Sequence, residues 1–507
     1  MTDAPGPDTS ATGGWRRRLG AHVGPIHLDR PVTESLAKRG ALSTAGLVAQ
    51  GGLRFLTSWL VGRLAGKASL GVLASAIATS TLLSLLWPTT TGSAASKYLA
   101  RARGAGDTAE LLGVAQHLSR RTVQAMVLLS AAAIPVWVIV DGGTVASALS
   151  VAALAAALSG YSFTRGVLLG TGHVARATTW DAIAAATGLL LLAVALAAGL
   201  RGTLLVLPMA GSFAAYTLAG WPYRAKGAIS RELRREVDHF VMLGVAGTIA
   251  STGFLQLSMV AVRRVTSLED AGQYAAALSL ATPASLLGAS LSLVLFPSLA
   301  EAWGRGDVAA FRGQTDRAMR ALTLVMVTIF ADLALSSRLV VRVVWGSTYD
   351  HAARYLPVLT VAVLASTLGI VSVNALTTRS RRGMQLTTGA SLAGMAVGVV
   401  VWLLAAPALG PQGIAIGYLV GTVCIAAVPL VAVWRSDAHR WHPLMLRLAA
   451  GMALLAALAT AQRTLGLSLW LDPVVAALFT AVWWLLCRHD LHLVPLPRPL
   501  RRTPRAR

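Results

Sequence analysis

The sequence predicts an all-α polytopic membrane protein with about fourteen transmembrane helices, in which two parallel six-helix lobes precede two C-terminal helices. Of the 507 residues, 55% are hydrophobic and only 13% are charged, which is too apolar a composition for a soluble globule. Apolar stretches of about twenty residues recur, the length that a helix needs to cross a hydrocarbon core of roughly 30 Å. The stretches lack the apolar-polar alternation of barrel strands, so helices are expected.

The expected spans form two sets of six and a final pair. The first lobe, residues 41–223, has spans at 41–64, 69–91, 123–140, 145–169, 178–200 and 203–223. The second lobe, residues 240–434, has spans at 240–262, 271–295, 318–335, 352–376, 387–406 and 413–434. The final pair, within residues 435–487, is 444–461 and 467–487. Residues 1–40 and 488–507 are expected to be polar tails.

The net charge of +23 is explained by the orientation of the helices in the membrane rather than by nucleic-acid binding. Most of the 44 lysines and arginines lie between the spans, and no basic segment carries the interleaved aromatic residues of a nucleic-acid surface. With the N-terminus inside, alternate loops hold most of these cations, as the positive-inside rule requires. We therefore expect a bacterial plasma membrane protein with both termini in the cytoplasm, and no signal peptide is recognised.

The basic segment 224–239 between the lobes has two interpretations. Ile229, Leu233 and Val237 recur every four residues among charges, which favours an amphipathic linker helix on the cytoplasmic membrane surface. The alternative is a solvated basic loop.

An internal repeat is visible between the two lobes. The strings VGR at 61–63, GVLASA at 71–76 and GD at 106–107 are echoed by VRR at 262–264, GQYAAA at 272–277 and GD at 306–307. Chance similarity of Ala-rich helices is the alternative, but the order and spacing are kept. Six spans separate the copies, so both have the same orientation, and a parallel repeat is expected to bind substrate between its halves.

Four blocks in the second half carry a resemblance to a known family. They are DAGQYAAA at 270–277, FPSL at 296–299 leading to GD at 306–307, VWGSTY at 344–349, and GPQGIA at 410–415. With these blocks the chain, over roughly residues 40 to 490, resembles a polysaccharide or lipid-linked oligosaccharide flippase of the MATE-like superfamily, related to O-antigen and lipid II flippases. The resemblance implies two six-helix lobes, a central cavity lined by helices one, two, seven and eight, and two extra C-terminal helices.

The resemblance also implies a function and partners. The expected activity is translocation of a polyprenyl-diphosphate-linked oligosaccharide from the cytoplasmic to the outer leaflet by alternating access, for cell-surface polysaccharide or cell-wall biosynthesis. The expected partners are this glycan substrate, membrane lipids, and a glycan polymerase or glycosyltransferases, with the chain itself a monomer. The alternative function is a cation-coupled multidrug or metabolite antiporter of the same superfamily.

Arg54 is the main candidate for contact with substrate. It lies roughly 20 Å along the first expected helix, a depth at which a charge costs at least about 2.5 kcal/mol and normally faces a wet cavity or the bundle interior. Gln50, Arg54 and Ser58 share one helix face, and arginine matches phosphate oxygens bidentately. A second polar stripe in the seventh span holds Thr252 and Gln256. We expect both stripes to face one cavity, and a structural interhelical contact is the alternative for Arg54.

Other charged residues have weaker assignments. The outer ends of helices one and seven carry a basic set that either lines the exit or reaches the headgroups: Arg63, Lys67, Arg263 and Arg264. Asp181 and Asp332 are candidates for ion coupling, although a local ion pair of Asp181, which lies near Arg176, is the commoner arrangement.

No enzymatic chemistry is expected. The sequence has no Walker-type nucleotide loop, no catalytic constellation and no metal-ligand cluster, so neither a cofactor nor a metal is predicted. Cys424 and Cys487 lie in apolar stretches without disulfide or ligand spacing. A membrane glycosyltransferase is disfavoured because the external loops are short.

Overall fold

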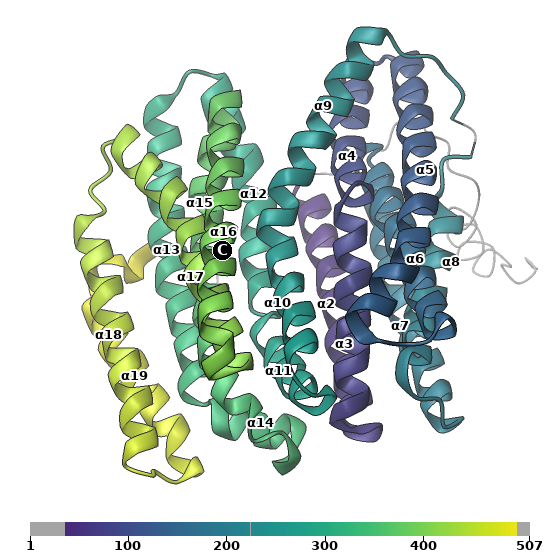
Figure 1. The fold of residues 1–507 in the computed structure, drawn as a ribbon. Coiled ribbons are helices and arrows are strands. Elements are labelled where there is room, and N and C mark those ends of the chain that lie inside the picture. Colours follow the sequence, from purple (N-terminus) through teal and green to yellow (C-terminus); the bar gives the residue numbers. More distant parts are fainter. Residues whose placement is uncertain (1–35, 224, 494–507) are drawn as a thin grey trace, which may run out of the picture. The chain divides into compact units, whose positions relative to one another are not determined.

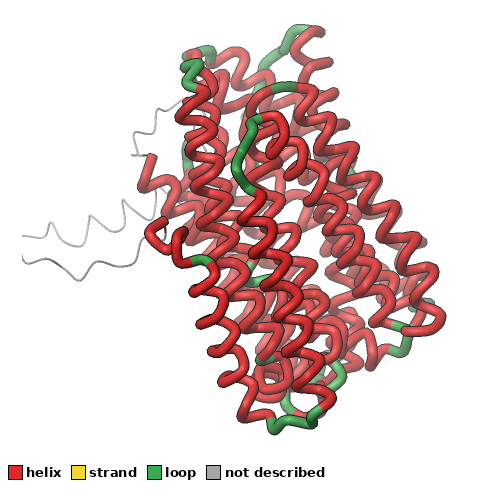
Figure 2. The backbone as a smooth tube through the Cα atoms, turned by 90° about the vertical axis from the view of Figure 1, so that its left-hand side faces the viewer, coloured by secondary structure: helices red, strands yellow, loops and turns green. Residues whose placement is uncertain are grey.

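The computed structural model describes residues 36–223 and 225–493, which form helices and loops with no strand among them (Figures 1 and 2). The expected N-terminal tail falls outside the described residues up to position 35, and the expected basic C-terminal tail falls outside them from position 494. The all-α fold class is confirmed.

Twelve helices in the described part of the chain are long and apolar enough to cross a membrane. Each matches one of the fourteen expected spans, and the two that do not qualify are the first, 41–64, and the eighth, 271–295. The first lies in a 29-residue helix whose polar residues, Gln50 and Arg54 among them, lower its hydropathy. The eighth is broken at Thr282–Ala284, since Pro283 removes a backbone hydrogen bond there.

The chain divides into two compact units whose limits follow packing rather than chain order. Unit 1 is Met1–Val61 with Val72–Ile249, and unit 2 is Gly62–Gly71 with Ala250–Arg507. The helices that begin in the first half are α2 (Leu36–Leu64), α3 (Gly66–Leu85), α4 (Pro88–Ala105), α5 (Thr108–Asp141), α6 (Val145–Gly170), α7 (Val174–Ala197), the short η1 (Gly202–Val206), α8 (Leu207–Gly220) and α9 (Arg231–Thr248).

The second half continues the seventh helix and adds the C-terminal pair. Its elements are the π-helical η2 (Ile249–Gly253), α10 (Phe254–Val265), α11 (Leu268–Ala281), α12 (Ser285–Gly304), α13 (Val308–Leu335), α14 (Ser337–Trp345), η3 (Ser347–Tyr349), α15 (Ala352–Arg379), α16 (Arg381–Leu409), α17 (Pro411–Ser436), α18 (His442–Thr464), η4 (Leu469–Leu471), α19 (Asp472–Leu486) and η5 (Arg488–Leu493).

The GD strings of the internal repeat form the same helix corner in each unit. Gly106 ends α4 with φ 72°, and Asp107 then caps α5 by accepting a hydrogen bond from Glu110 N at 2.8 Å. In unit 2 Gly306 has φ 70°, and Asp307 caps α13 through Ala310 N at 2.9 Å. A left-handed glycine followed by an aspartate cap ends one helix and starts the next.

The repeated glycines near positions 71 and 272 make a reciprocal contact within unit 2. A Cβ on Gly71 would strike the carbonyl of Leu268, and a Cβ on Gly272 would strike the carbonyl of Lys67. Lys67 and Gly71 stand at the same offset from Leu268 and Gly272, so the two copies touch through equivalent positions. Glycine is required at both because the backbones approach so closely.

Within the expected linker 224–239, residues 225–230 are not helical, and Arg231 begins a helix that runs on into the seventh expected span. Ser230 caps α9 by accepting from Leu233 N at 3.1 Å, and the helical run continues from Arg231 to Val265. Val237 is buried with residues of α4 and α5 rather than turned toward a membrane surface. The spacing of its apolar residues indicates an amphipathic helix, and the protein itself covers the apolar face.

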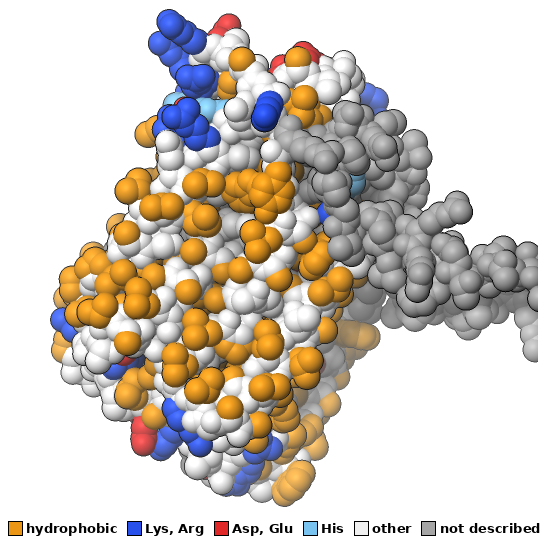
Figure 3. All heavy atoms as spheres, turned by 90° about the vertical axis from the view of Figure 1, so that its right-hand side faces the viewer, with side chains coloured by type: hydrophobic (Ala, Val, Ile, Leu, Met, Phe, Trp, Pro, Cys, Tyr) orange, Lys and Arg blue, Asp and Glu red, His pale blue; other side chains and the backbone are white. Residues whose placement is uncertain are grey.

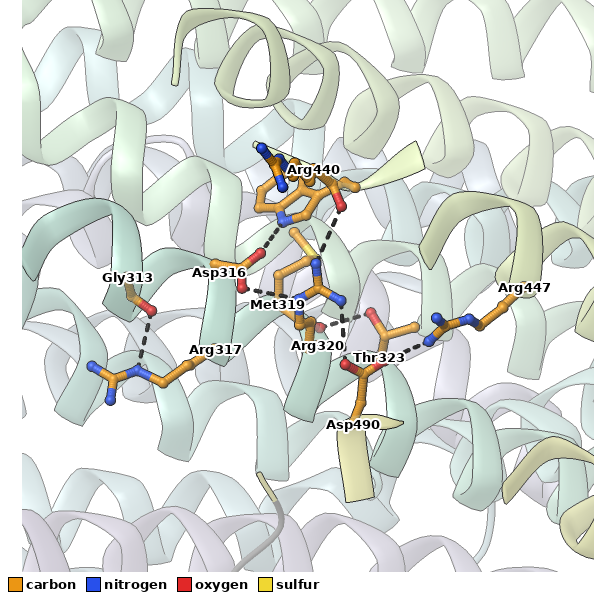
Figure 4. Close-up of polar contacts among 10 residues, drawn as sticks. Gly313, Asp316, Arg317, Met319, Arg320, Thr323, Arg440, Arg447 and Asp490 are labelled. Atoms are coloured by element: carbon orange, nitrogen blue, oxygen red, sulfur yellow. Dashed lines mark hydrogen bonds and ion pairs between the residues drawn. The ribbon is translucent and has the colours of Figure 1, made fainter. Parts of the chain in front are cut away.

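The C-terminal pair α18–α19 is tied to α13 and α14 at both ends. At one end Arg320 of α13 contacts Asp490 of η5 at 3.2 Å, and Arg447 of α18 contacts the same carboxylate at 2.7 Å (Figure 4). At the other end Arg338 of α14 pairs with Asp472 of α19, whose side chain is 0% exposed. These contacts make the pair a fixed part of unit 2.

Asp437, just beyond α17, anchors a second polar cluster of unit 2. It pairs with Arg379 and lies 3.5 Å from His439. Burial raises the pKa of the Asp437 carboxyl, but hydrogen bonds from His439 and Arg379 outweigh this and hold the pKa below its ordinary value.

Membrane-facing surface is recognisable on α5, α7 and α16, which expose large hydrophobic side chains along their length. Figure 3 shows one face of the molecule with hydrophobic side chains across its middle and charged ones toward its ends. Such a surface suits lipid as solvent.

Candidate functional site

Arg54 lies in α2 with its side chain exposed. It lies near Tyr161, but within the described ranges no hydrogen bond or ion pair joins its guanidinium to another residue. An arginine in a membrane helix normally pairs with a carboxylate or a carbonyl. With respect to the described residues, Arg54 therefore leaves its five N–H donors to a ligand or to water.

Asp181 of α7 is the centre of a buried polar network that adjoins this arginine in unit 1. Its carboxylate accepts from Arg165 Nε at 3.0 Å and from Tyr161 OH at 2.9 Å, and its side chain is 0% exposed. Gln50 Nε2 donates to the Asp181 backbone oxygen at 3.2 Å and to Oδ1 at 3.4 Å. The expected ion pair of Asp181 exists, but its partner is Arg165 rather than Arg176.

The same network fixes α2 against α7. Thr178 Oγ1 donates to the Leu42 carbonyl at 2.8 Å, and Gly46 leaves room for the Asp181 carboxylate, which a Cβ there would strike. Gln50 adds the contact one turn before Arg54. Since Arg165 satisfies the charge of Asp181, that carboxylate does not neutralise Arg54.

The second stripe lies where the seventh helix changes its winding. Thr252 falls within the π-helical η2 and is exposed, and Gln256, one turn later in α10, is half-buried. π-helical turns inside α-helices occur frequently at functional sites. Ser58 of α2 is also half-buried. A cavity shared by the two stripes stays a prediction.

The outer basic residues have unlike surroundings. Lys67 pairs with Glu269 at 2.5 Å, Arg264 is exposed, Arg263 is half-buried, and Arg63 lies near Tyr349. A cavity of about 420 Å³ beside Lys67 is also lined by the acidic residues Glu269, Asp270 and Asp350. The lining at Lys67 is therefore mixed in charge rather than uniformly electropositive.

Asp332 takes part in the attachment of the C-terminal pair. It lies in α13 and accepts a hydrogen bond from Thr480 Oγ1 of α19 at 2.7 Å. Its role in ion coupling stays a prediction.

Arg165 and Tyr161 are the network residues that sequence reasoning missed. Arg165 lies inside α6, within the expected span 145–169, four residues after Tyr161 and on the same helix face. That spacing within an apolar stretch was the available signal.

Part of the chain matches a known protein family. Residues 120–354 match a family described as "Polysaccharide biosynthesis protein". No curated protein matches the chain.

Solved structures with the same fold include two kinds of transporter. The lipid II flippase MurJ, in an inward closed conformation, is 11% identical with a TM-score of 0.66, covering 89% of this chain and 99% of MurJ. An inward-facing multidrug resistance MATE family transporter is 13% identical with a TM-score of 0.59, covering 81% and 97%. The eukaryotic MATE transporter AtDTX14 is 16% identical with a TM-score of 0.57, covering 80% and 97%.

These matches agree with the blocks that carried the resemblance in the sequence. The fold of the MATE transporters and MurJ extends over four fifths of the chain or more, and the polysaccharide biosynthesis family matches its central part. The resemblance of this membrane protein to the flippases of the MATE-like superfamily is thereby confirmed.

Proposed function

We propose that this protein is a flippase that moves a polyprenyl-diphosphate-linked oligosaccharide from the cytoplasmic to the outer leaflet of a bacterial plasma membrane. The observation that carries the proposal is Arg54, a guanidinium in a membrane helix that has no partner among the described residues. The matched polysaccharide biosynthesis family and the MurJ-like fold support this class of substrate.

Arg54 suits a diphosphate for electrostatic reasons. A cation or an anion alone is costly to place in the membrane, and a cation paired with an anion costs far less than the two apart. A guanidinium presents two parallel N–H groups to one phosphate, whereas sugar hydroxyls bind without requiring charge. In the proposed cycle the headgroup enters from the cytoplasm, Arg54 holds the diphosphate, and the lobes then open outward while the polyprenyl chain stays in lipid.

The network around Asp181 supports the role of Arg54 because it holds the helix that carries this arginine. Gln50 fixes α2 to α7 one turn away, so the backbone that carries Arg54 is held in place. Because Arg165 supplies the counter-charge of Asp181, the positive charge of Arg54 is not cancelled from within the protein.

The test compares Arg54→Ala with Arg54→Lys and with Arg463→Ala, an exposed arginine in the last turn of α18. Purified full-length protein is reconstituted into vesicles with a fluorescent polyprenyl-diphosphate oligosaccharide, and outer-leaflet label is quantified. We expect Arg54→Ala to abolish translocation, Arg54→Lys to retain part of it, and Arg463→Ala to match the wild type. Normal translocation by Arg54→Ala would contradict the proposed role.

The antiporter alternative is separated by the same vesicles. A cation-coupled antiporter would move a cationic drug against a proton or sodium gradient, whereas the flippase moves the lipid-linked sugar. Asp181, one of the two carboxylates considered for coupling, is already paired with Arg165, which favours the flippase.

A further inference from the structure

The helix α4 presents an exposed face unlike that of the membrane-facing helices. Every residue of α4 is described, and none of its large hydrophobic side chains is exposed. Its open side instead carries Thr89, Ser93, Lys97 and Arg101, spaced every four residues and therefore stacked on one face. Such a face cannot be solvated by lipid, so it borders water.

The side chains on this face are all hydrogen-bond donors. Two hydroxyls precede two cations, and no carboxylate lies on the same stripe. Ser93 and Lys97 are separated by one helical turn, about 6 Å along the axis. A hydroxyl and an ammonium at this separation suit the oxygens of one diphosphate.

The two cations differ in how far they are neutralised. Arg101 contacts Glu110 of α5 at 3.0 Å and Glu236 of α9 at 3.2 Å, so it joins three helices. Lys97 has no carboxylate within ion-pair distance in the part of the chain that the structure describes. Its ammonium lies 4.3 Å from the centroid of the Phe240 ring instead. Lys97 therefore keeps its charge while an aromatic face holds it in place.

The surroundings of Lys97 also favour an anion. Partial burial lowers the pKa of the ammonium, Glu236 opposes this, and the charge of Arg101 adds to it. A phosphate bound beside the ammonium would relieve both effects by stabilising the charged form.

We propose that the face of α4 formed by Ser93 and Lys97 is a second anion site, which takes the diphosphate of a lipid-linked substrate before Arg54 does. This proposal rests on the flippase function, and it adds a site in unit 1 at the middle of α4, a helix whose basic residues favour a cytoplasmic location for its C-terminal half. The ligand chemistry is a diphosphate, from a prenyl lipid or free in solution.

The test measures binding of geranyl diphosphate to the purified full-length protein in zwitterionic nanodiscs. We expect Lys97→Ala to weaken binding roughly tenfold, since a hydrogen bond to a charged group is lost. Lys97→Arg should stay close to the wild type. Lys226→Ala, at an exposed lysine outside α4, is the matched control and should leave binding unchanged. Wild-type affinity in Lys97→Ala would overturn the proposal.

Ser93→Glu provides a variant that keeps the lysine. A glutamate four residues before Lys97 would form a helical ion pair with it and cancel its charge. We expect this variant to bind as weakly as Lys97→Ala with an unchanged thermal unfolding temperature. If Ser93→Glu binds geranyl diphosphate as tightly as the wild type, the site is wrong even if Lys97→Ala fails to fold.

Two further ligands identify what is recognised. Inorganic pyrophosphate that competes with geranyl diphosphate shows that the diphosphate alone suffices, and pyrophosphate that fails to compete shows that the prenyl lipid is required as well. Either result supports an anion site, whereas equal binding of geraniol would overturn it. Normal translocation by Arg54→Ala with weakened binding by Lys97→Ala would refute the role of Arg54 and leave the α4 site standing.

Discussion

The ion pair between Arg165 and Asp181 gives the sharpest test of the buried network. Arg165→Leu removes the cation that is paired with Asp181, whose side chain is 0% exposed. Tyr161 and Gln50 still donate to it, but neither cancels its charge. Loss of one partner of a buried pair costs about 3–5 kcal/mol, so we expect the free energy of unfolding to fall by about that amount.

A double variant separates the pair from its parts. Replacing both residues by leucine removes the two buried charges together, and such replacements are often close to neutral. We therefore expect Arg165→Leu with Asp181→Leu to be more stable than Arg165→Leu alone, by at least about 2 kcal/mol. Tyr161→Phe removes one hydrogen bond to the ionised Asp181 carboxylate and should cost about 1.5–3 kcal/mol, less than the loss of Arg165.

The assay is equilibrium unfolding of the full-length protein in mixed micelles, followed by the fluorescence of its 14 tryptophans. Arg463→Leu, at an exposed site, serves as the control and should change stability by less than about 0.5 kcal/mol. The reasoning fails if Arg165→Leu unfolds like the wild type. It also fails if the double variant loses the sum of the two single effects, because the residues would then be uncoupled.

Three further predictions concern other parts of the fold. The pKa of Asp437 is lowered in the folded protein, so the stability that this residue contributes is present above its unfolded pKa of about 3.9 and is lost as the pH falls through the folded pKa. The stability of the wild type, measured by acid unfolding, should therefore fall more steeply below about pH 4 than that of Asp437→Asn, and parallel curves would contradict this. Arg338→Ala should lower the free energy of unfolding by about 3–5 kcal/mol because it strands the buried Asp472, and limited proteolysis between α18 and α19 should increase. Gly166→Leu should prevent folding, since any side chain would meet the backbone of α4, whereas Gly104→Ala has open space and should elute normally in size-exclusion chromatography.

The helices were largely predictable because the signal for a membrane span is local. Twelve of the expected spans were recovered, and hydropathy needs no knowledge of neighbours. Helix ends were less accurate where a helix leaves the membrane. The third span was expected at 123–140, but α5 already begins at Thr108, because a polar helical extension carries no hydropathy signal.

Packing decided what covers the apolar face of the amphipathic segment before the seventh span. The spacing of Leu233 and Val237 indicates one apolar face, and a sequence cannot say whether lipid or protein covers it. In the structure α4 and α5 cover it. The same holds for the limits of the two units, since the segment Gly62–Gly71, which comprises the end of α2 and the start of α3, belongs by contact to unit 2.

The sequence by itself determined that the chain is a helical membrane protein with a charged residue, Arg54, inside its first helix. These conclusions depend on composition and on position along one helix. Only the tertiary structure decided that Asp181 pairs with Arg165 and not with Arg176, which is nearer in the sequence. It also decided that no carboxylate of the described residues forms an ion pair with Arg54 or Lys97. Ion pairing depends on which side chains of different helices meet within about 4 Å, and that is set by packing rather than by sequence distance.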